Sequence, residues 1–485
     1  MRISRLIGVT VLLAACSSSP TAGTGDASTN GGSSASMGGA SGTGGGANGG
    51  TSPTGGTSSS GAQPGGGASS SGGVSSTGGT SSTGGTSSSG GGSSSSGGTT
   101  SSGGTTSSGG ASSTGGTTGT GGSGAQWVLG YYVGYQINDY PIAQIDWSGL
   151  THVAFAPLTL KSDLSLDLSF DDSNGTGTDD AKALATAAHA HGAKALLMLG
   201  GAGAGGNIAT AASAANRSAF VTTLVGTLAT LGYDGIDLDW EDSVDLDDLV
   251  ALAKALRASK PDIVLSYPGG AINGNYQTVD PRFATLAESL DRFDVQTYYP
   301  STAVAGQGWS SWFLSPLGGV TGSTPIAIDD TLQRYVTAGV PKAKLGMGTA
   351  FYAICYTGGI TGPRQPTDGS VRIVGGDNAY PLSAFFASGS TFDTSAAGER
   401  QRDTAAAEPY LSLASAVDDG GCGANTQYIS YEDETSIIAK GTFSKTNGYG
   451  GIIVWTIQEG WLKSGASGGR APNALMEALK TGFLD

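Results

Sequence analysis

The sequence has few of the residues that metal and thiol sites need. Its 485 residues contain three histidines and three cysteines, and the cysteines show no metal-binding spacing. His189 and His191 both stand in an Ala-rich stretch that is typical of a helix. We therefore expect no metal, no cofactor and no catalytic centre built from Cys and His.

Charged residues, and basic ones above all, are also scarce. They make up 13% of the chain, and 23 Lys and Arg stand against 38 Asp and Glu, for a net charge of −15. Nucleic-acid binding needs clustered Lys and Arg, so we expect no nucleic-acid partner. A neutral polysaccharide fits this charge better, although acidity also simply keeps an exported protein soluble.

The first quarter of the chain lacks aromatic residues. Residues 17–125 consist almost entirely of Gly, Ser and Thr, and Asp26 is the one charged residue among them. Such a segment has too little apolar surface to offset the entropy lost on ordering, so it predicts a disordered linker. Residues 126–485 contain all seven Trp residues. They are long enough for one large barrel with an insertion, or for two small domains.

Residues 1–16 have the pattern of an export signal. A basic start precedes a short apolar run and Leu13-Ala14-Ala15-Cys16, and the run is too short for a permanent membrane helix. The end resembles a bacterial lipobox, which implies cleavage before Cys16 and a lipid anchor there; an ordinary secretory signal is the alternative. By analogy with Gram-negative sorting, Ser17 favours the outer membrane. We expect a monomer in the cell envelope whose only membrane contact is this anchor.

Short apolar runs alternate with helical patterns after residue 126. The predicted strands are Trp127–Val133, Thr151–Pro157, Ala193–Leu199, Gly235–Trp240, Asp262–Tyr267, Phe293–Tyr298, Lys344–Phe351 and Gly451–Trp455. The clearest predicted helices are Asp180–His191, Ala212–Leu231, Leu246–Ala258 and Thr331–Ala338. Continuous apolar strands separated by helices indicate parallel strands buried on both faces, and eight units predict a (β/α)₈ TIM barrel. A doubly wound open sheet is the alternative, but its Gly-rich turn is absent after the first strand.

One connection, at about 352–427, is too long for a bare loop. It follows the seventh strand and precedes the seventh helix, so we expect an insertion with its own structure beside the substrate site. Cys355 and Cys422 lie near its two ends. Because two remaining thiols in an exported protein are usually paired, we expect them to form a disulfide.

The strongest chemical signal is the stretch Asp234–Glu241, which reads DGIDLDWE. On a strand, alternation sends Asp237, Asp239 and Glu241 to one side, into the barrel. Crowded carboxylates raise one another's pKa, which keeps a proton available for acid catalysis by Glu241 at the C-terminal rim. A divalent-cation site and a solvated acidic face are the alternatives.

This stretch resembles the D-G-x-D-x-D-x-E signature of glycoside hydrolase family 18, the chitinases and their relatives. Weaker matches follow in the same order along the chain. They are Leu129–Tyr132, Leu150–Phe155, Leu196–Gly203, Val295–Tyr298, Ile429–Asp433 with Ser436 and Lys440, and Gly450–Trp455. The resemblance covers essentially all of residues 127–485.

The resemblance implies substrate-assisted, retaining hydrolysis of N-acetylglucosamine polymers. Glu241 is then the acid, Asp239 stabilises the acetamido group, Asp237 shares a proton with Asp239, and Tyr298 holds the acetyl oxygen. Trp455 would form the apolar floor of the sugar site. Its alternative role is core packing. We also place four residues of neighbouring strands among the substrate contacts, namely Tyr131, Phe155, Gln296 and Tyr267.

Four residues, at three places in the chain, depart from the family's pattern. Met198 stands where the third strand usually carries Ser, Tyr299 stands where many members carry Asp, and Asp242-Ser243 replaces Tyr-Pro. Other functions on the same fold therefore stay open. They are an endo-β-N-acetylglucosaminidase acting on N-glycans, a peptidoglycan hydrolase, and a chitin-binding lectin that does not cut.

Overall fold

The computed structural model describes residues 125–272, 277–299, 309–377, 379–392, 399–419, 421–463, 466 and 469–485. The predicted signal peptide with Cys16, and the predicted linker up to residue 124, lie outside these residues. The described residues belong to one compact unit.

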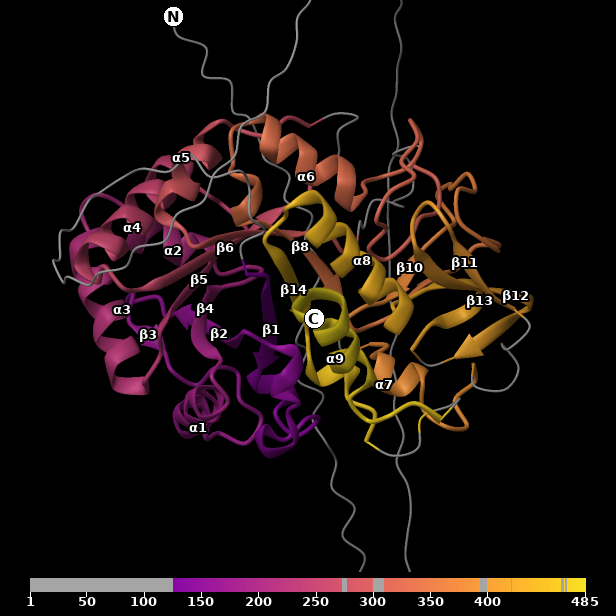
Figure 1. The fold of residues 1–485 in the computed structure, drawn as a ribbon, viewed down its shortest axis with the longest axis horizontal. Helices are drawn as coiled ribbons and strands as arrows, with labels where there is room; N and C mark the ends of the chain where they lie inside the picture. The colour runs from indigo at the N-terminus through magenta and orange to yellow at the C-terminus, as the bar shows by residue number, and fades with distance from the viewer. Residues whose placement is uncertain are drawn as a thin grey trace, which may run out of the picture. The chain divides into compact units, whose positions relative to one another are not determined.

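Eight parallel strands of the described residues close into a barrel (Figure 1). They are β1 (Trp127–Val133), β2 (His152–Leu160), β4 (Lys194–Gly200), β5 (Gly235–Asp239), β6 (Val264–Gly270), β7 (Arg292–Gln296), β8 (Leu345–Ala350) and β14 (Gly451–Trp455). The short strand β3 (Leu166–Asp167) pairs antiparallel with the end of β2. Pairing of β1 with both β2 and β14 closes the ring. The predicted TIM barrel is confirmed.

Helices connect successive strands and cover the outside of the barrel. They are α1 (Gly177–Ala190), α2 (Gly205–Ala212), α3 (Arg217–Leu231), α4 (Leu246–Ser259), α5 (Arg282–Ser289), α6 (Ile328–Thr337), α8 (Glu434–Asn447) and α9 (Ala474–Leu479), followed by a π-turn at Lys480–Leu484. Between β1 and β2 stand three short 3₁₀ turns: Gly134–Gln136, Ile142–Gln144 and Trp147–Gly149. Two more occur at Lys342–Lys344 and Gln458–Gly460. None of the helices within the described ranges is long and apolar enough to cross a membrane.

The prediction of one helix over 212–231 was wrong at its start. The segment belongs to two helices, because Ser213 leaves the helical conformation with a ψ of 155° and ends α2. The longer helix begins at Arg217 and ends at Leu231, and it is capped by Gly232, whose φ of 81° suits glycine.

Alternate residues of each strand face two different packing layers. Leu129, Tyr131, Leu196 and Ile453 pack together inside the barrel. Their strand neighbours, such as Tyr132 and Leu197, belong to the large cluster formed with the surrounding helices. Because a strand has a period of two, the side on which one residue points fixes the side of every other residue in that strand.

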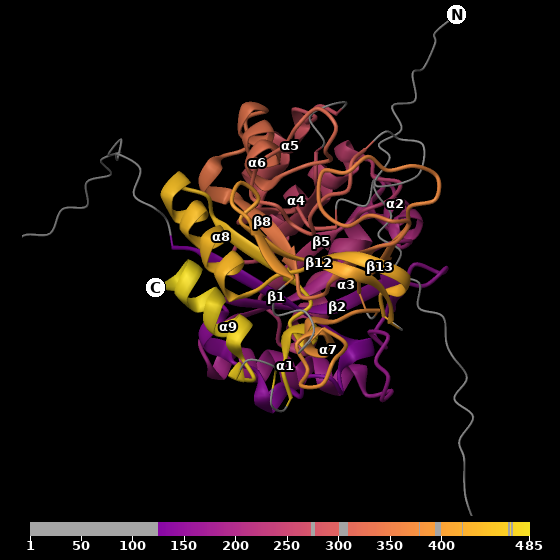
Figure 2. The ribbon, with the colours of Figure 1, turned by 90° about the vertical axis from the view of Figure 1, so that its right-hand side faces the viewer.

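The segment between β8 and α8 forms an antiparallel sheet of its own, with strand order β10-β9-β13-β12-β11. Its elements are β9 (Ile354–Tyr356), β10 (Ile373–Gly375), α7 (Leu382–Phe385), β11 (Arg400–Asp403), β12 (Glu408–Asp419) and β13 (Gly423–Ser430). Figure 2 shows β12 and β13 in front of the barrel strands. Insertion residues such as Tyr352 and Tyr428 pack with Tyr298 and Trp455, which follow or end barrel strands. The insertion therefore stands at the carboxyl end of the barrel.

Candidate active site

The acidic side chains of β5 point into the barrel, as their spacing predicts. Asp237 and Asp239 are 1% and 2% exposed, and Glu241 follows the end of the strand in a half-buried position. Ile236, Leu238 and Trp240 pack in the outer layer. The three carboxyl groups therefore form a column that rises through the barrel to its carboxyl end, which we call the carboxylate column.

Two hydroxyl groups hold the base of the carboxylate column. Tyr131 on β1 donates a hydrogen bond to Asp237 Oδ2 at 2.7 Å, and Ser266 on β6 donates to Asp237 Oδ1 at 2.6 Å. Burial raises the pKa of Asp237 to about 6, while these two hydrogen bonds act in the opposite direction. Sequence reasoning missed Ser266, although it stands at an inward position of β6. Met198, the neighbour of Asp237 on β4, has no hydroxyl group. Ser266 supplies a hydroxyl to Asp237 instead.

Asp239 occupies a closely fitted position in the middle of the column. Gly201 N–H donates to the Asp239 carbonyl at 2.8 Å, and a Cβ on Gly200 would lie 2.1 Å from that oxygen. Both glycines have positive φ, at 118° and 98°, so the Gly-Gly pair permits this approach. Burial, then the charges of Glu241 and Asp237, raise the pKa of Asp239 well above its usual value.

Glu241 at the top of the column accepts a hydrogen bond from Gln296. Gln296 Nε2 on β7 donates to Glu241 Oε1 at 2.8 Å. Burial raises the pKa of Glu241, the hydrogen bond from Gln296 lowers it, and the charge of Asp242 raises it further. The structure therefore brings Gln296, predicted as a substrate contact, to the predicted acid itself.

Tyr298 and Trp455 lie at the carboxyl ends of their strands, near Tyr131, which binds the base of the column. Tyr298 follows β7 and is half-buried; a Cβ on Gly348 of β8 would lie 2.9 Å from its ring, so glycine makes room for it. Trp455, the last residue of β14, lies with its ring centroid 5.1 Å from that of Tyr131. Trp455 is half-buried and packs against both the barrel interior and the insertion. Its position suits both packing and sugar contact.

Comparison with known proteins identifies the family. The model of the glycosyl hydrolases family 18 matches residues 128–460 of this chain. The chain belongs to family 18 of the glycosyl hydrolases. A "Probable endochitinase" of Caenorhabditis elegans is 28% identical over 286 residues, which cover 53% of this chain and 42% of that relative. The match thus spans about two fifths of that relative's length.

Solved structures share the family 18 fold. The Group IV chitinase of Ostrinia furnacalis superposes with a TM-score of 0.59 at 20% identity, over 74% of this chain and 100% of that one. A chitinase-like agglutinin of Robinia pseudoacacia gives a TM-score of 0.56 at 19% identity, over 73% and 99%. Since these include both a chitinase and an agglutinin, the family 18 fold does not by itself establish activity.

Of the predicted substrate contacts, Phe155 lies outside this family 18 site, and Tyr267 packs in the outer layer but lies close enough to the carboxylate column to feel its charges. Phe155 is fully buried in the outer layer, where its ring packs on Phe170 at 4.8 Å between centroids. Tyr267 packs on Phe293 at 5.3 Å in the same layer. Burial raises the pKa of Tyr267, and the charges of Asp239 and Glu241 add to the effect. The inward positions of β2 and β6 belong instead to Ala154, Ala156 and Ser266.

The positions that depart from the family pattern have structural roles of their own. Asp242 accepts hydrogen bonds from the backbone of Gly203 at 3.1 Å and Gly205 at 3.0 Å, which joins the loops after β4 and β5. Tyr299 donates its N–H to Leu314 at 2.7 Å.

Cys355 and Cys422 form a disulfide in the insertion, with Cα atoms 5.3 Å apart and a sequence separation of 67. Within the described ranges, no group of three or more His, Cys, Asp or Glu has a geometry that could hold a metal ion.

Proposed function

We propose that this protein hydrolyses β-1,4 links between N-acetylglucosamine units, as in chitin, by substrate-assisted catalysis with retention. One observation carries the proposal. Asp239 Oδ1 is a buried acceptor with no hydrogen-bond partner among the described residues. An unpaired buried acceptor is costly, and the N–H of an acetamido group would supply the missing donor.

Glu241 is the proton donor in this proposal. Its raised pKa keeps the acid protonated toward neutral pH. The proton passes to the glycosidic oxygen as the bond from that oxygen to the anomeric carbon breaks. The acetamido oxygen forms the new bond to the anomeric carbon and gives an oxazolinium ion. Water then attacks the anomeric carbon from the face that the leaving group vacated, opposite the acetamido oxygen. The bond from the acetamido oxygen to that carbon breaks, and the water gives a proton to Glu241.

The other members of the site stabilise the oxazolinium ion. Asp239, once ionised, accepts the acetamido N–H and balances the positive charge. Asp237, which already has two hydroxyl donors, takes up or releases the proton that Asp239 exchanges. Tyr298 orients the acetyl oxygen, and Trp455 forms the apolar floor beside Tyr131.

Product stereochemistry tests the mechanism. NMR of fresh digests of chitin oligomers should show the β-anomer as first product, and oligomers without the N-acetyl group at the cleavage site should resist hydrolysis. A thiazoline analogue of the oxazolinium ion should inhibit. The α-anomer as first product, or equal cleavage of deacetylated sugar, would contradict the mechanism. Parallel digests of an N-glycoprotein and of peptidoglycan would identify the alternative substrates, and binding to chitin without cleavage would indicate a lectin.

We also propose that the chain is a lipid-anchored protein of the bacterial envelope. The support is the Leu-Ala-Ala-Cys sequence that ends at Cys16. Labelled palmitate should be incorporated into the full-length chain and not into Cys16→Ser, and wild type should fractionate with the outer membrane. Equal labelling of the two proteins would contradict the anchor.

A further inference from the structure

A hydrogen-bonded bridge joins the insertion to the first strand of the barrel. Tyr135 stands in the 3₁₀ turn that follows β1, and its hydroxyl group donates to Asp377 Oδ2 at 2.9 Å. Gln136, the next residue, donates from Nε2 to the other carboxyl oxygen, Asp377 Oδ1, at 3.2 Å. Asp377 belongs to the insertion, 242 residues after Tyr135 in the chain. We call Tyr135, Gln136 and Asp377 the bridge.

Two glycines hold Asp377 at the rim of the barrel. Gly375 and Gly376 have φ values of 90° and 102°, a conformation that suits glycine, and they turn the chain just before Asp377. Gly376 N–H donates to the Ala353 carbonyl at 3.0 Å, and a Cβ on Gly375 would lie 2.6 Å from that same oxygen. Ala353 follows shortly after Ala350, the last residue of β8. Asp377 therefore stands close to the carboxyl end of the barrel.

Buried side chains connect the bridge to the sugar site. Thr456 follows Trp455, and its hydroxyl group donates to Gln136 Oε1 at 2.7 Å. Thr456 is fully buried and Gln136 is 3% exposed. The amide of Gln136 thus binds Thr456 through its oxygen and Asp377 through its nitrogen. A sugar chain could not pass between Trp455 and Asp377 without breaking these buried hydrogen bonds, which is costly.

The bridge and the proposed acid stand on different sides of the barrel. Glu241 follows β5 and Tyr135 follows β1; β4 and β2 separate these strands on one side of the ring, and β6, β7, β8 and β14 separate them on the other. The acid gives its proton to the leaving sugar, so the leaving part of the chain lies on the side of Glu241. In a β-1,4-linked chain, the next sugar is attached at the end of the ring opposite to the anomeric carbon. The non-reducing part of the chain therefore extends from Trp455 toward the bridge.

We infer that the bridge closes the substrate cleft on its non-reducing side and makes the enzyme exo-acting. A chain end can bind with its last sugar against the bridge, whereas the middle of a long chain would have to displace Asp377 from Tyr135 and Gln136. The inference rests on the proposed function and specifies its mode of action. Hydrolysis releases one short product of fixed length, a mono- or disaccharide, from the non-reducing end of the polymer.

Asp377→Ala tests the inference, because it removes the acceptor of both hydrogen bonds in the bridge. From chitin oligomers labelled at the reducing end, wild type should release one short unlabelled product, whose length does not depend on that of the oligomer. Asp377→Ala should instead give a mixture of labelled fragments from the first turnovers. On soluble glycol chitin, its loss of viscosity per reducing end formed should exceed that of wild type several-fold.

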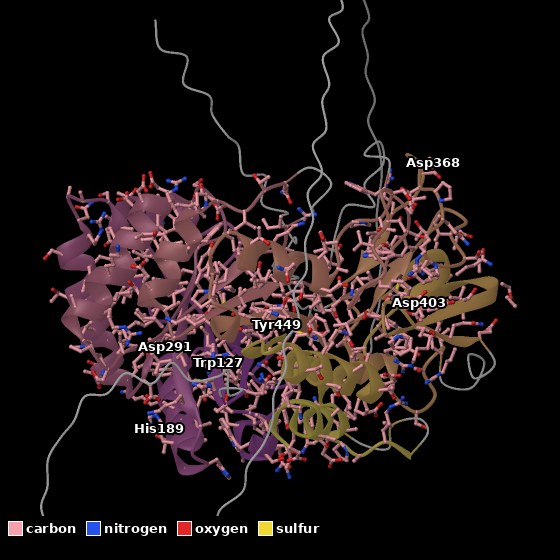
Figure 3. The ribbon with its side chains drawn as sticks, turned by 45° about the horizontal axis from the view of Figure 1, so that its top comes forward. Trp127, His189, Asp291, Asp368, Asp403 and Tyr449 are labelled. Carbon is pink, nitrogen blue, oxygen red and sulfur yellow. A yellow bond between two sulfur atoms is a disulfide. The ribbon has the colours of Figure 1, made fainter. Side chains whose placement is uncertain are left out.

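Asp368→Ala is the matched control within the insertion. Figure 3 shows Asp368 at the outer border of the insertion, far from Trp127 of β1. Asp368 is exposed and accepts hydrogen bonds from Ser370 in its own turn, so its loss should keep the wild-type products. If Asp377→Ala does not fold, Tyr135→Ala opens the bridge from the side of β1 and should give the same mixture. Internal cutting by wild type, or a single short product from Asp377→Ala, would overturn the inference.

Crystals of Glu241→Gln soaked with a long chitin oligomer provide a readout that needs no turnover. The electron density of the bound chain should end, at its non-reducing end, against Tyr135 and Asp377, with the bridge intact. A sugar unit beyond the bridge, or between its residues, would overturn the inference even in an active enzyme. A wild type that cleaves no chitin oligomer, although Glu241→Gln binds the chain in this way, would instead contradict the proposed function.

Discussion

Ser266 donates a hydrogen bond to Asp237 over 2.6 Å, from β6 to the neighbouring strand β5. It joins Tyr131 as a donor and lowers the pKa of Asp237 against the effect of burial. The base of the carboxylate column thus has a hydroxyl on each side, although the hydroxyl usual on the third strand is replaced by Met198.

Ser266→Ala should move the acid limb of the kcat/KM profile to higher pH. Without the donor, the pKa of Asp237 rises further above about 6, so the Asp237–Asp239 pair takes up a second, inactivating proton at a higher pH. A hydrogen bond to a charged group contributes about 1.5–3 kcal/mol, which corresponds to roughly one to two pH units at most.

Ser266→Thr is the matched control, because it restores a hydroxyl at the same inward position. Its acid limb should lie between those of Ser266→Ala and wild type. An acid limb in Ser266→Ala that coincides with that of wild type would mean that the hydroxyl does not act on the shared proton.

Glu241→Gln should remove most of the activity while leaving the fold unchanged. Gln keeps the size of the side chain and a possible contact with Gln296 but has no proton to give. Loss of a general acid lowers the rate by about 10²–10⁴-fold. Glu288→Gln, an exposed carboxyl on α5, should retain wild-type kcat under the same assay. Activity of Glu241→Gln within a few-fold of wild type would remove Glu241 from the mechanism.

The sequence predicted the site best on strands in which polar residues mark the side that faces the inside of the barrel. On β5 the acidic residues marked the inner side, so Asp237, Asp239 and Glu241 followed from alternation alone. The run at 152–158 is apolar on both sides, and only pairing with β1 shows that Ala154 faces inward and Phe155 outward. Periodicity could not decide between them, since both faces of a barrel strand are buried.

Asp294 and Ser266 show what the alternation along a strand can predict and what it cannot. Asp294 shares its parity with Gln296 and Tyr298, so the predicted site residues of β7 already indicated that it points inward. The register that joins Asp294 through Gly346 and Gly451 to Trp127 could not be predicted, because it depends on pairings among β7, β8, β14 and β1, which lie far apart in sequence. The fold, in contrast, followed from local patterns that recur eight times.

The disulfide should stabilise the insertion without contributing to the chemistry. Closing a loop of 67 residues between Cys355 and Cys422 stabilises by up to about 4 kcal/mol in the chain-entropy model. The double variant Cys355→Ser/Cys422→Ser should therefore melt at a lower temperature, while its kcat well below that temperature stays close to wild type. Reduced wild type serves as the control and should melt like the double variant. Equal melting of oxidised and reduced wild type would contradict a stabilising bond.

A buried ionic cluster joins the insertion to the barrel and should make stability depend on pH. Lys440 of α8 lies 2.7 Å from Glu432 and 3.2 Å from Glu408 of β12, and all three side chains are fully buried. Ser315 N–H donates to Glu408 at 2.9 Å, and Thr349 donates to Glu432 at 2.7 Å. One ammonium group thus faces two carboxyl groups, and the cluster is neutral only if one carboxyl keeps its proton.

Glu408 is the group that keeps this proton. Burial and the charge of Glu432 raise its pKa from 4.5 to about 8, although Lys440 acts in the opposite direction. A carboxyl whose pKa is raised on folding contributes stability that is fully present below its unfolded pKa and is lost as the pH rises through its folded pKa. The window of loss therefore extends from about pH 4.5 to about pH 8.

Glu408→Gln should remove this pH dependence, because the amide stays neutral and can still accept the Ser315 N–H. The difference in Tm between the variant and wild type should accordingly move in favour of the variant as the pH rises from 4.5 to 8. Thermal melts at several pH values would measure it, with Glu434→Gln, which disturbs an outer ion pair with Arg470, as the control. A difference in Tm that stays constant across the window would show that Glu408 is ionised in the folded protein, with both carboxylates sharing the charge of Lys440.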